Sequence, residues 1–140
     1  MQLGKNKTYQ QLDSLFSEYI RKRAIRVIGG CERCLTQKVD IQKDNGDIFP
    51  GWKQLQCSHF IGRSKKSTRF DEDNAIGICG ACHLYLTAHP LEHIEFFKAR
   101  LGEQGFDMLR ARAQETGRID RAAIKLWLKQ ELGKMDNGVN

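Results

Sequence analysis

Gln56-Cys57-Ser58-His59-Phe60 opens the stretch that decides the fold, and Cys79-Gly80-Ala81-Cys82-His83 closes it. Between these two segments lie a basic loop and the pair Asp73-Asn74. The stretch therefore presents a histidine at the end of an apolar run, then an asparagine, then a histidine fused to a Cys-x-x-Cys pair. We expect the chemistry of the protein to be concentrated in these residues.

Four of the five cysteines form two Cys-x-x-Cys pairs, Cys31 with Cys34 and Cys79 with Cys82. Zinc in a structural site takes four soft ligands in a tetrahedron, and two such pairs separated by a folded insert provide them from two directions. A redox-active pair is the alternative, but no βαβ pattern surrounds either pair. We therefore predict a structural Zn²⁺ bound by all four thiolates. We expect the fifth cysteine, Cys57, to be a buried small apolar residue.

The length of 140 residues fits a single domain. The net charge of +6, from 23 Lys and Arg against 17 Asp and Glu, favours a polyanionic partner, with nucleic acid as the first choice. No apolar run approaches the roughly eighteen residues that a membrane helix needs, and the first residues lack the apolar segment of a signal peptide. We expect a cytoplasmic protein with no membrane partner, whose cysteines bind metal and do not form disulfides.

The N-terminal segment predicts an amphipathic helix over residues 8–28. Thr8-Tyr9-Gln10-Gln11 has the capping-box pattern, and Gly29-Gly30 is a natural stop because glycine can take positive φ. The apolar residues of this segment fall on one helical face. They are Leu12, Leu15, Phe16, Tyr19, Ile20, Ala24, Val27 and Ile28.

The Asn45-Gly46 pair predicts a hairpin turn after a short strand near Ile41. Because Pro50-Gly51 would interrupt a return strand at that place, we expect residues 55–60 to be the pairing partner. The loop over residues 62–70 follows.

Beyond the loop, residues 75–78 predict a short strand and residues 81–88 a short helix that ends before Pro90. Apolar stripes then predict one helix up to Gly102, a second that ends near Gly117, and a third from Asp120 with Gly133 as its cap. We predict one α+β domain over residues 1–140. Its core covers about residues 29–89, with helical additions at 8–28 and 90–134.

Three polar residues of the central stretch are suited to phosphodiester hydrolysis. A general base for this reaction needs a near-neutral pKa, a partner for its second ring nitrogen, and a nearby cation. His59 could be this base, and Asn74 could either fix its orientation or only cap the following turn. Because His83 follows the second cysteine pair, bound zinc would fix its position. It could then bind a second, hydrolytic cation or take a place in the zinc shell.

Taken together, these residues resemble the HNH nuclease family, whose fold is the ββα-metal motif. The residues that carry the resemblance are Cys31-x-x-Cys34, Cys57-Ser58-His59, Asp73-Asn74 and Cys79-x-x-Cys82-His83. The chain is further similar to the phage NinG (Rap) recombination proteins and related phage HNH proteins. This second resemblance rests on Ser58-His59-Phe60, Arg69 to Asn74, the CxxC and helix that follow, and Leu101-Gly102. The HNH resemblance covers about a third to a half of the chain, and the NinG-like resemblance most of its second half.

The resemblance implies a DNA endonuclease that leaves a 5′-phosphate and a 3′-hydroxyl. His59 would be the general base, Asn74 would orient it, and His83 would bind a catalytic divalent cation, Mg²⁺, Mn²⁺ or Zn²⁺. The four paired cysteines would hold the structural zinc. Phage recombination or DNA processing would be the setting, with recombination or packaging proteins as partners. Cleavage of both strands would favour a homodimer.

Ser58 departs from the family pattern, because many members place a metal-binding Asp immediately before the base histidine. Asp71 or Asp73 could fold in to replace it, Cys57 could bind, or the DNA phosphate and waters could complete the shell. The same gap supports an alternative function, a non-catalytic zinc-stapled DNA-binding accessory protein.

The loop between His59 and Asn74 carries four cations and, up to Phe70, no acid. A solvated run of charge is one interpretation. Since the loop joins the candidate base to its asparagine, we predict instead that these cations contact the DNA backbone. They are Arg63, Lys65, Lys66 and Arg69.

Overall fold

The computed structural model describes the backbone of residues 2–138 and the side chains of residues 9–138, and it has an α+β fold. The described helices are α1 (Gln2–Val27), α2 (Lys66–Arg69), α3 (Gly80–Ala88), α4 (Pro90–Ala113) and α5 (Arg121–Asp136). Two short 3-10 turns are η1 (Gly51–Gln54) and η2 (Glu72–Asn74). The strands are β1 (Ile41–Gln42), β2 (Ile48–Phe49), β3 (Gln56–His59) and β4 (Ala75–Ile78).

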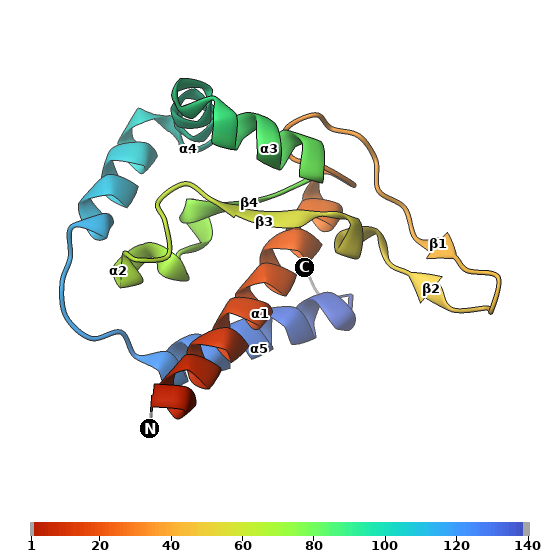
Figure 1. Ribbon diagram of the computed structural model, residues 1–140, viewed down its shortest axis with the longest axis horizontal. Helices are drawn as coiled ribbons and strands as arrows, with labels where there is room; N and C mark the ends of the chain where they lie inside the picture. Colours follow the sequence, from red (N-terminus) through yellow and green to blue (C-terminus); the bar gives the residue numbers. More distant parts are fainter. Residues whose placement is uncertain (1, 139–140) are drawn as a thin grey trace.

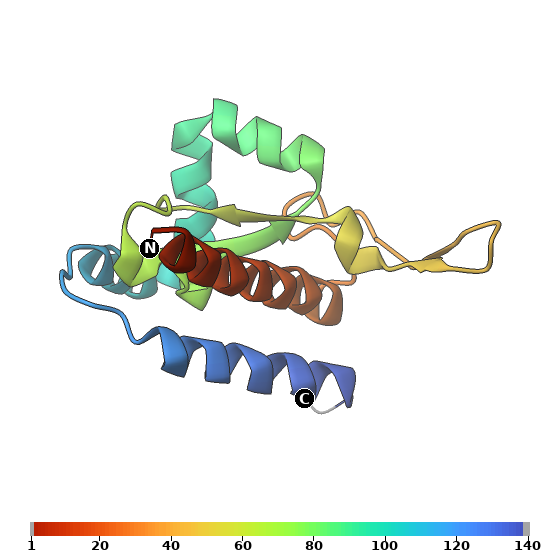
Figure 2. The ribbon, with the colours of Figure 1, turned by 60° about the horizontal axis from the view of Figure 1, so that its bottom comes forward.

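The antiparallel pair β3–β4 lies at the centre of the molecule (Figure 1). Gln56 pairs with Ile78 at one end, and His59 pairs with Ala75 at the other. Helices α3 and α4 cover one face of the pair, and α1 covers the other, with α5 outside α1 (Figure 2). The centre is therefore a thin sheet between two helical layers.

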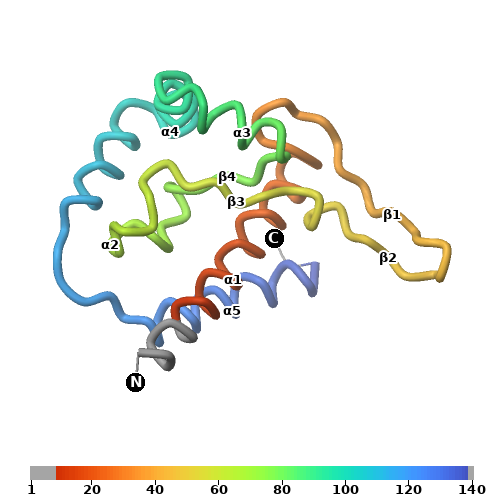
Figure 3. Tube along the Cα trace, in the orientation of Figure 1, coloured from red at the N-terminus to blue at the C-terminus, as the bar shows by residue number. Residues whose placement is uncertain are grey.

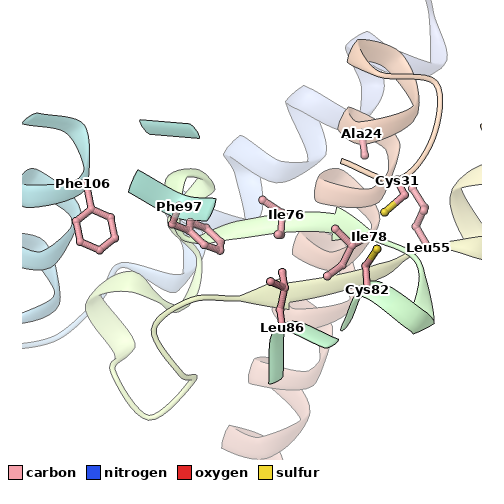
Figure 4. Close-up of a cluster of buried hydrophobic side chains, with 9 residues drawn as sticks. All are labelled: Ala24, Cys31, Leu55, Ile76, Ile78, Cys82, Leu86, Phe97 and Phe106. Carbon is pink, nitrogen blue, oxygen red and sulfur yellow. The ribbon is translucent and has the colours of Figure 1, made fainter. Parts of the chain in front are cut away.

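Each face of the β3–β4 pair has its own apolar cluster, because alternate residues of a strand point to opposite faces. Ile76 and Ile78 pack with residues of α3 and α4 (Figure 4), whereas Ala75 packs with residues of α1 and α5. The first cluster contains Ala24, Cys31, Leu55, Ile76, Ile78, Cys82, Leu86, Phe97 and Phe106. The second contains Leu12, Phe16, Tyr19, Ile20, Phe70, Ala75, Leu128 and Leu132.

The predicted helix of residues 8–28 forms as part of α1, but the helix begins six residues earlier, at Gln2. Thr8 therefore lies within the helix, and the predicted capping box is wrong. The helix ends at Val27, and Gly29 takes a φ of 85°, as its sequence predicts. Val27 and Ile28, predicted on the apolar face, are 68% and 40% exposed because they lie at the end of the helix.

The hairpin turn at Asn45-Gly46 is confirmed, but the predicted pairing of its strand is wrong. Residues 41–42 pair with Ile48 and Phe49, which complete their short ladder just before Pro50. The segment 56–59 pairs with β4 instead. The proline therefore ends the return strand and does not prevent it.

The predicted strand at 75–78 is confirmed, and the helix predicted over 81–88 begins one residue earlier, at Gly80. The predicted break at Gly102 is a kink inside α4, where φ is 76°. Asp120 caps α5 through its carboxylate, which accepts a hydrogen bond from the Ala123 amide. The predicted end of this helix at Gly133 is wrong, because α5 continues to Asp136.

Figure 3 follows the chain from α4 around the edge of the molecule to α5, which lies beside α1. Ile119, just before α5, and Ile124, in its first turn, both pack against the second cluster. Among residues 2–138, no helix combines the length and the apolar character that crossing a bilayer requires.

The contact between α1 and β4 leaves no space for a side chain at Gly77. A Cβ atom at this position would lie 2.8 Å from Ala24 Cβ and 3.2 Å from Ile20 O.

We expect Gly77→Ala to lower the free energy of unfolding by about 1–3 kcal/mol, because α1 must move away from the strand. Urea unfolding measures this. Gly133→Ala is the control, since its Cβ would meet nothing within 4 Å and alanine favours a helix. Equal unfolding midpoints for Gly77→Ala and the wild type would contradict the expectation.

Candidate metal centre and active site

Cys31, Cys34, Cys79 and Cys82 come together although the inner two, Cys34 and Cys79, are 45 positions apart in the sequence. Their Sγ atoms all lie within 4.8 Å of one another, and the Cys34 and Cys79 sulfurs are 3.9 Å apart. Zinc–sulfur bonds of about 2.3 Å in a tetrahedron place the sulfurs about 3.8 Å apart. The cluster could therefore hold a metal ion, and its donor set and spacing fit zinc.

Backbone amides point at one sulfur of the cluster. The amides of Cys34 and Cys79 lie 3.5 and 3.3 Å from Cys31 Sγ, so both pairs contribute donors to the same thiolate. The Arg33 guanidinium also donates to Cys82 Sγ, at 3.4 Å. These donors favour the charged form of sulfur, which is the form that binds a metal. Figure 4 shows the Cys31 and Cys82 sulfurs directed toward each other, Cys31 from the loop that follows α1 and Cys82 from the first turn of α3.

Two thiols of the cluster have pKa values shifted in opposite directions. Hydrogen bonds with Thr36 lower the pKa of Cys34 to about 6, whereas burial raises the pKa of Cys82 to about 12. A metal binds the thiolate form of cysteine, so metal binding should release a proton from the buried Cys82 thiol.

The cluster also joins α1 to the free edge of the β3–β4 pair. Glu32, between the first two cysteines, donates its amide to Gly77 O at 3.0 Å and accepts from the Gly77 amide at 2.6 Å through its carboxylate. Arg100 of α4 donates to the other carboxylate oxygen at 3.2 Å. Glu32 therefore bonds the edge of β4 that has no strand partner in the described part of the chain and links this edge to α4.

His59 lies at the end of β3, on the side of the sheet that faces α1. Its ring packs 5.6 Å from the Phe16 ring, and its Nε2 lies 2.9 Å from the carbonyl oxygen of Arg69. Because a carbonyl can only accept, Nε2 carries the proton and Nδ1 keeps a lone pair. Burial lowers the pKa of His59, so the ring is neutral at pH 7. A neutral imidazole with a free Nδ1 is chemically able to accept a proton.

Asn74 is fully buried, and its hydrogen bonds fix the loop between His59 and Asn74. Its Nδ2 donates to Ile61 O at 2.8 Å and to Thr68 O at 3.0 Å, and its Oδ1 accepts from the Ile61 amide at 2.8 Å. Its backbone oxygen accepts from the Phe60 amide at 2.9 Å. Asn74 therefore orients His59 indirectly, by fixing the loop whose Arg69 carbonyl contacts the ring.

His83 lies in α3, on the opposite side of the sheet. Its Nδ1 is 2.6 Å from Gln56 Oε1, which leaves Nε2 with a lone pair. The ring lines an open hollow of about 380 Å³ together with Gln56, Gly80, Leu84 and Thr87. Gln56 and His59 are at opposite ends of β3, so His59 and His83 are not brought together.

Asp73, the candidate replacement for the missing Asp, contacts Arg112 of α4. Arg112 donates to Asp73 Oδ2 at 3.1 Å and to both carboxylate oxygens of Asp71 at 2.6 and 3.2 Å. In the part of the chain whose side chains are described, the four cysteines are the only group of three or more Cys, His, Asp or Glu within ligand distance. No second cation site is preassembled there.

Of the four loop cations, Arg63, Lys65 and Lys66 are exposed. Arg69 instead forms a bidentate pair with Asp13 of α1, at 2.6 and 3.0 Å. This pair anchors the loop to α1 and so contributes to the position of the Arg69 carbonyl.

His93 of α4 is a candidate that the sequence analysis missed. Its ring lies 5.4 Å from both Phe60 and Phe97, and its Nε2 is buried without a hydrogen-bond partner. Burial, and after it the charge of His83, lower the pKa of His93. Its packing against Phe97 of the first cluster places His93 on the α3–α4 side of the sheet. Nothing in the sequence separates His93 from other polar residues of an amphipathic helix.

Comparison of the chain with protein-family models, with curated proteins and with solved structures finds no match.

Removal of the metal should unfold the core, because the cluster joins α1, the edge of β4 and α3. We expect the purified wild type to carry one zinc per chain and to lose its cooperative unfolding transition when a chelator removes it. Cys79→Ser should lose the metal, whereas Cys57→Ser, outside the cluster, should keep it. Elemental analysis and thermal unfolding measure both. Full zinc content in Cys79→Ser would contradict the assignment.

The free energy of unfolding should fall as the pH decreases below about 6.5. The folded protein lowers the pKa of His59, so the unfolded chain binds this proton more readily, and unfolding becomes easier as protons are added. We expect His59→Asn to show a smaller loss of unfolding free energy between pH 7.5 and 5.5 than the wild type, measured by urea unfolding. The matched control is His89→Asn, which replaces an exposed histidine. An unchanged pH dependence in His59→Asn would refute the expectation.

Proposed function

We propose that this protein is a metal-dependent DNA endonuclease of the HNH type, acting in phage recombination or DNA processing. One observation supports it most strongly. A strand that ends in His59, a loop fixed by Asn74, a paired strand, and a helix that carries His83 follow one another in the order of the ββα-metal motif. The four-cysteine cluster lies directly beside this unit, where structural zinc would clamp it.

In this proposal His59 is the general base. Its Nδ1 accepts a proton from the attacking water, while the Arg69 carbonyl keeps the ring in the required tautomer. The water oxygen forms a bond to phosphorus as the bond to the 3′ oxygen breaks, which leaves a 5′-phosphate and a 3′-hydroxyl. Asn74 is a positioning residue, because it touches the loop and not the ring.

A bound divalent cation would stabilise the charge on the phosphate and the leaving oxygen. His83 is the candidate ligand, through Nε2, and because its ring lies on the opposite face of the β3–β4 pair from His59, the bound DNA would have to bring the cation to the phosphate. Ser58 is a poor ligand, and Asp73 is paired with Arg112. The protein therefore supplies few ligands, and the cation should bind weakly until DNA contributes its phosphate oxygens.

A zinc-stapled DNA-binding accessory protein is the second candidate. Two observations favour it: Ser58 replaces the usual Asp, and His59 and His83 face opposite sides of the β3–β4 pair. Such a protein would bind DNA with steep salt dependence and would be indifferent to the loss of His59.

Nicking of supercoiled plasmid with Mg²⁺ or Mn²⁺ separates the two candidates. We expect wild type to nick and His59→Ala to lose about 10²–10⁴-fold in rate, as removal of a general base does. His83→Ala should require more metal for the same rate. His89→Ala, an exposed histidine outside the site, is the matched control and should nick normally. If wild type fails to nick with any divalent metal, or if His59→Ala nicks at the wild-type rate, the nuclease proposal is refuted.

A further inference from the structure

A basic pocket lies where the start of α5 approaches α1 and α2. Its volume is about 350 Å³, and no acidic residue lines it. We call it the Tyr9 pocket. Its lining residues are Tyr9, Lys66, Gly117, Arg118, Ile119 and Arg121.

The cations around this pocket are held in place by an aromatic ring. Lys66 Nζ lies 5.5 Å from the Tyr9 ring centre, Arg121 Cζ lies 5.5 Å from it, and Arg69 Cζ lies 4.9 Å from it. The Tyr9 ring in turn stacks on Phe70, with ring centres 6.4 Å apart. Cation–π contacts of this kind restrict long side chains while leaving their N–H groups free to donate.

The nearby carboxylates are already engaged. Asp13 pairs with Arg69, and Asp120 accepts from the Ala123 amide at 3.0 Å. Among the described side chains, Lys66, Arg118 and Arg121 have no carboxylate within 4.0 Å. Three positive charges without an ion-pair partner attract an anion, and guanidinium groups match phosphate oxygens in geometry.

The pocket is connected to the candidate active site through Arg69. The side chain of Arg69 contacts the Tyr9 ring, and its carbonyl contacts His59 Nε2. Lys66 belongs to the same loop as the exposed Arg63 and Lys65. A strand bound along this loop would therefore pass His59 and reach the pocket on the α1 side of the molecule.

We propose that the Tyr9 pocket binds a backbone phosphate of the DNA strand beyond the position of cleavage. This assignment rests on the proposed function for the identity of the ligand. It places part of the DNA-binding surface at the α4–α5 connection, outside the ββα unit, and it gives α5 a function besides packing.

Salt-dependent binding to a short DNA duplex tests the proposal. Each cation that contacts a phosphate contributes about 0.9 to the slope of log K against log salt, so its loss weakens binding about eightfold at 0.1 M relative to 1 M salt. We expect the double variant Arg118→Gln with Arg121→Gln to bind roughly 10- to 60-fold more weakly at 0.1 M salt, with a slope lower by about 1 to 2. Arg118→Lys with Arg121→Lys keeps the charge and should keep most of the slope.

The matched control is Lys43→Gln with Lys98→Gln, which removes the same charge from two exposed residues outside the pocket. A loss of affinity and slope confined to the pocket variant supports the proposal, provided that both variants unfold like wild type. An equal loss in both pairs would overturn it, because only net charge would matter. Binding to anionic vesicles that depends on Arg118 and Arg121, without such dependence for DNA, would also overturn it.

Plasmid nicking in the same preparations separates this proposal from the nuclease assignment. If wild type nicks DNA but the pocket variant binds as wild type does, the pocket proposal fails and the nuclease stands. If wild type does not nick but the pocket variant alone loses affinity, the nuclease fails and the pocket stands as a DNA contact.

Discussion

The β3–β4 pair depends on being covered on both faces, because an isolated two-stranded hairpin is at best marginally stable in water. Its strands are only four residues long, and β4 is buried over its whole length. Helix α1 approaches one face closely enough to exclude a Cβ atom at Gly77. Helices α3 and α4 cover the other face, and the cysteine cluster lies between the segment that follows α1 and the start of α3. A metal bound there would join the two helical layers.

The loop between β3 and β4, described in full over residues 60–74, forms no sheet hydrogen bonds of its own, and the side chain of Asn74 bonds its backbone groups instead. Asn74 satisfies three backbone groups of the loop from a fully buried position, where an unpaired amide would cost about 1–3 kcal/mol. Arg69 and Asp13 anchor the same loop to α1. Because these contacts fix the carbonyl that holds His59, the position of one imidazole depends on residues of α1, β4 and the loop together.

Local patterns in the sequence were enough to predict the α+β class, the strand at 75–78, the helix after it, and the association of the four cysteines. These features depend on short-range periodicity, turn residues and ligand spacing. The partner of β3 could not be predicted, because strand pairing depends on which faces the helices cover. The start of α1 was missed because the polar residues before Thr8 carry no apolar stripe, and α5 continued past Gly133 because helix packing outweighs the propensity of one glycine.

The candidate site was predictable as a list of residues but not as an arrangement. The sequence places His59, Asn74 and His83 in order, yet strand alternation decides which face each side chain reaches, and this alternation depends on register. The same argument explains Asp73, whose partner Arg112 lies 39 residues away in α4. His59 faces α1 and the basic loop, whereas His83 lies in α3 and contacts Gln56 on the other side of the sheet. In the proposed nuclease, a DNA strand would have to bend around the β3–β4 pair for one phosphate to reach both histidines, because the two rings lie on opposite faces and near opposite ends of β3.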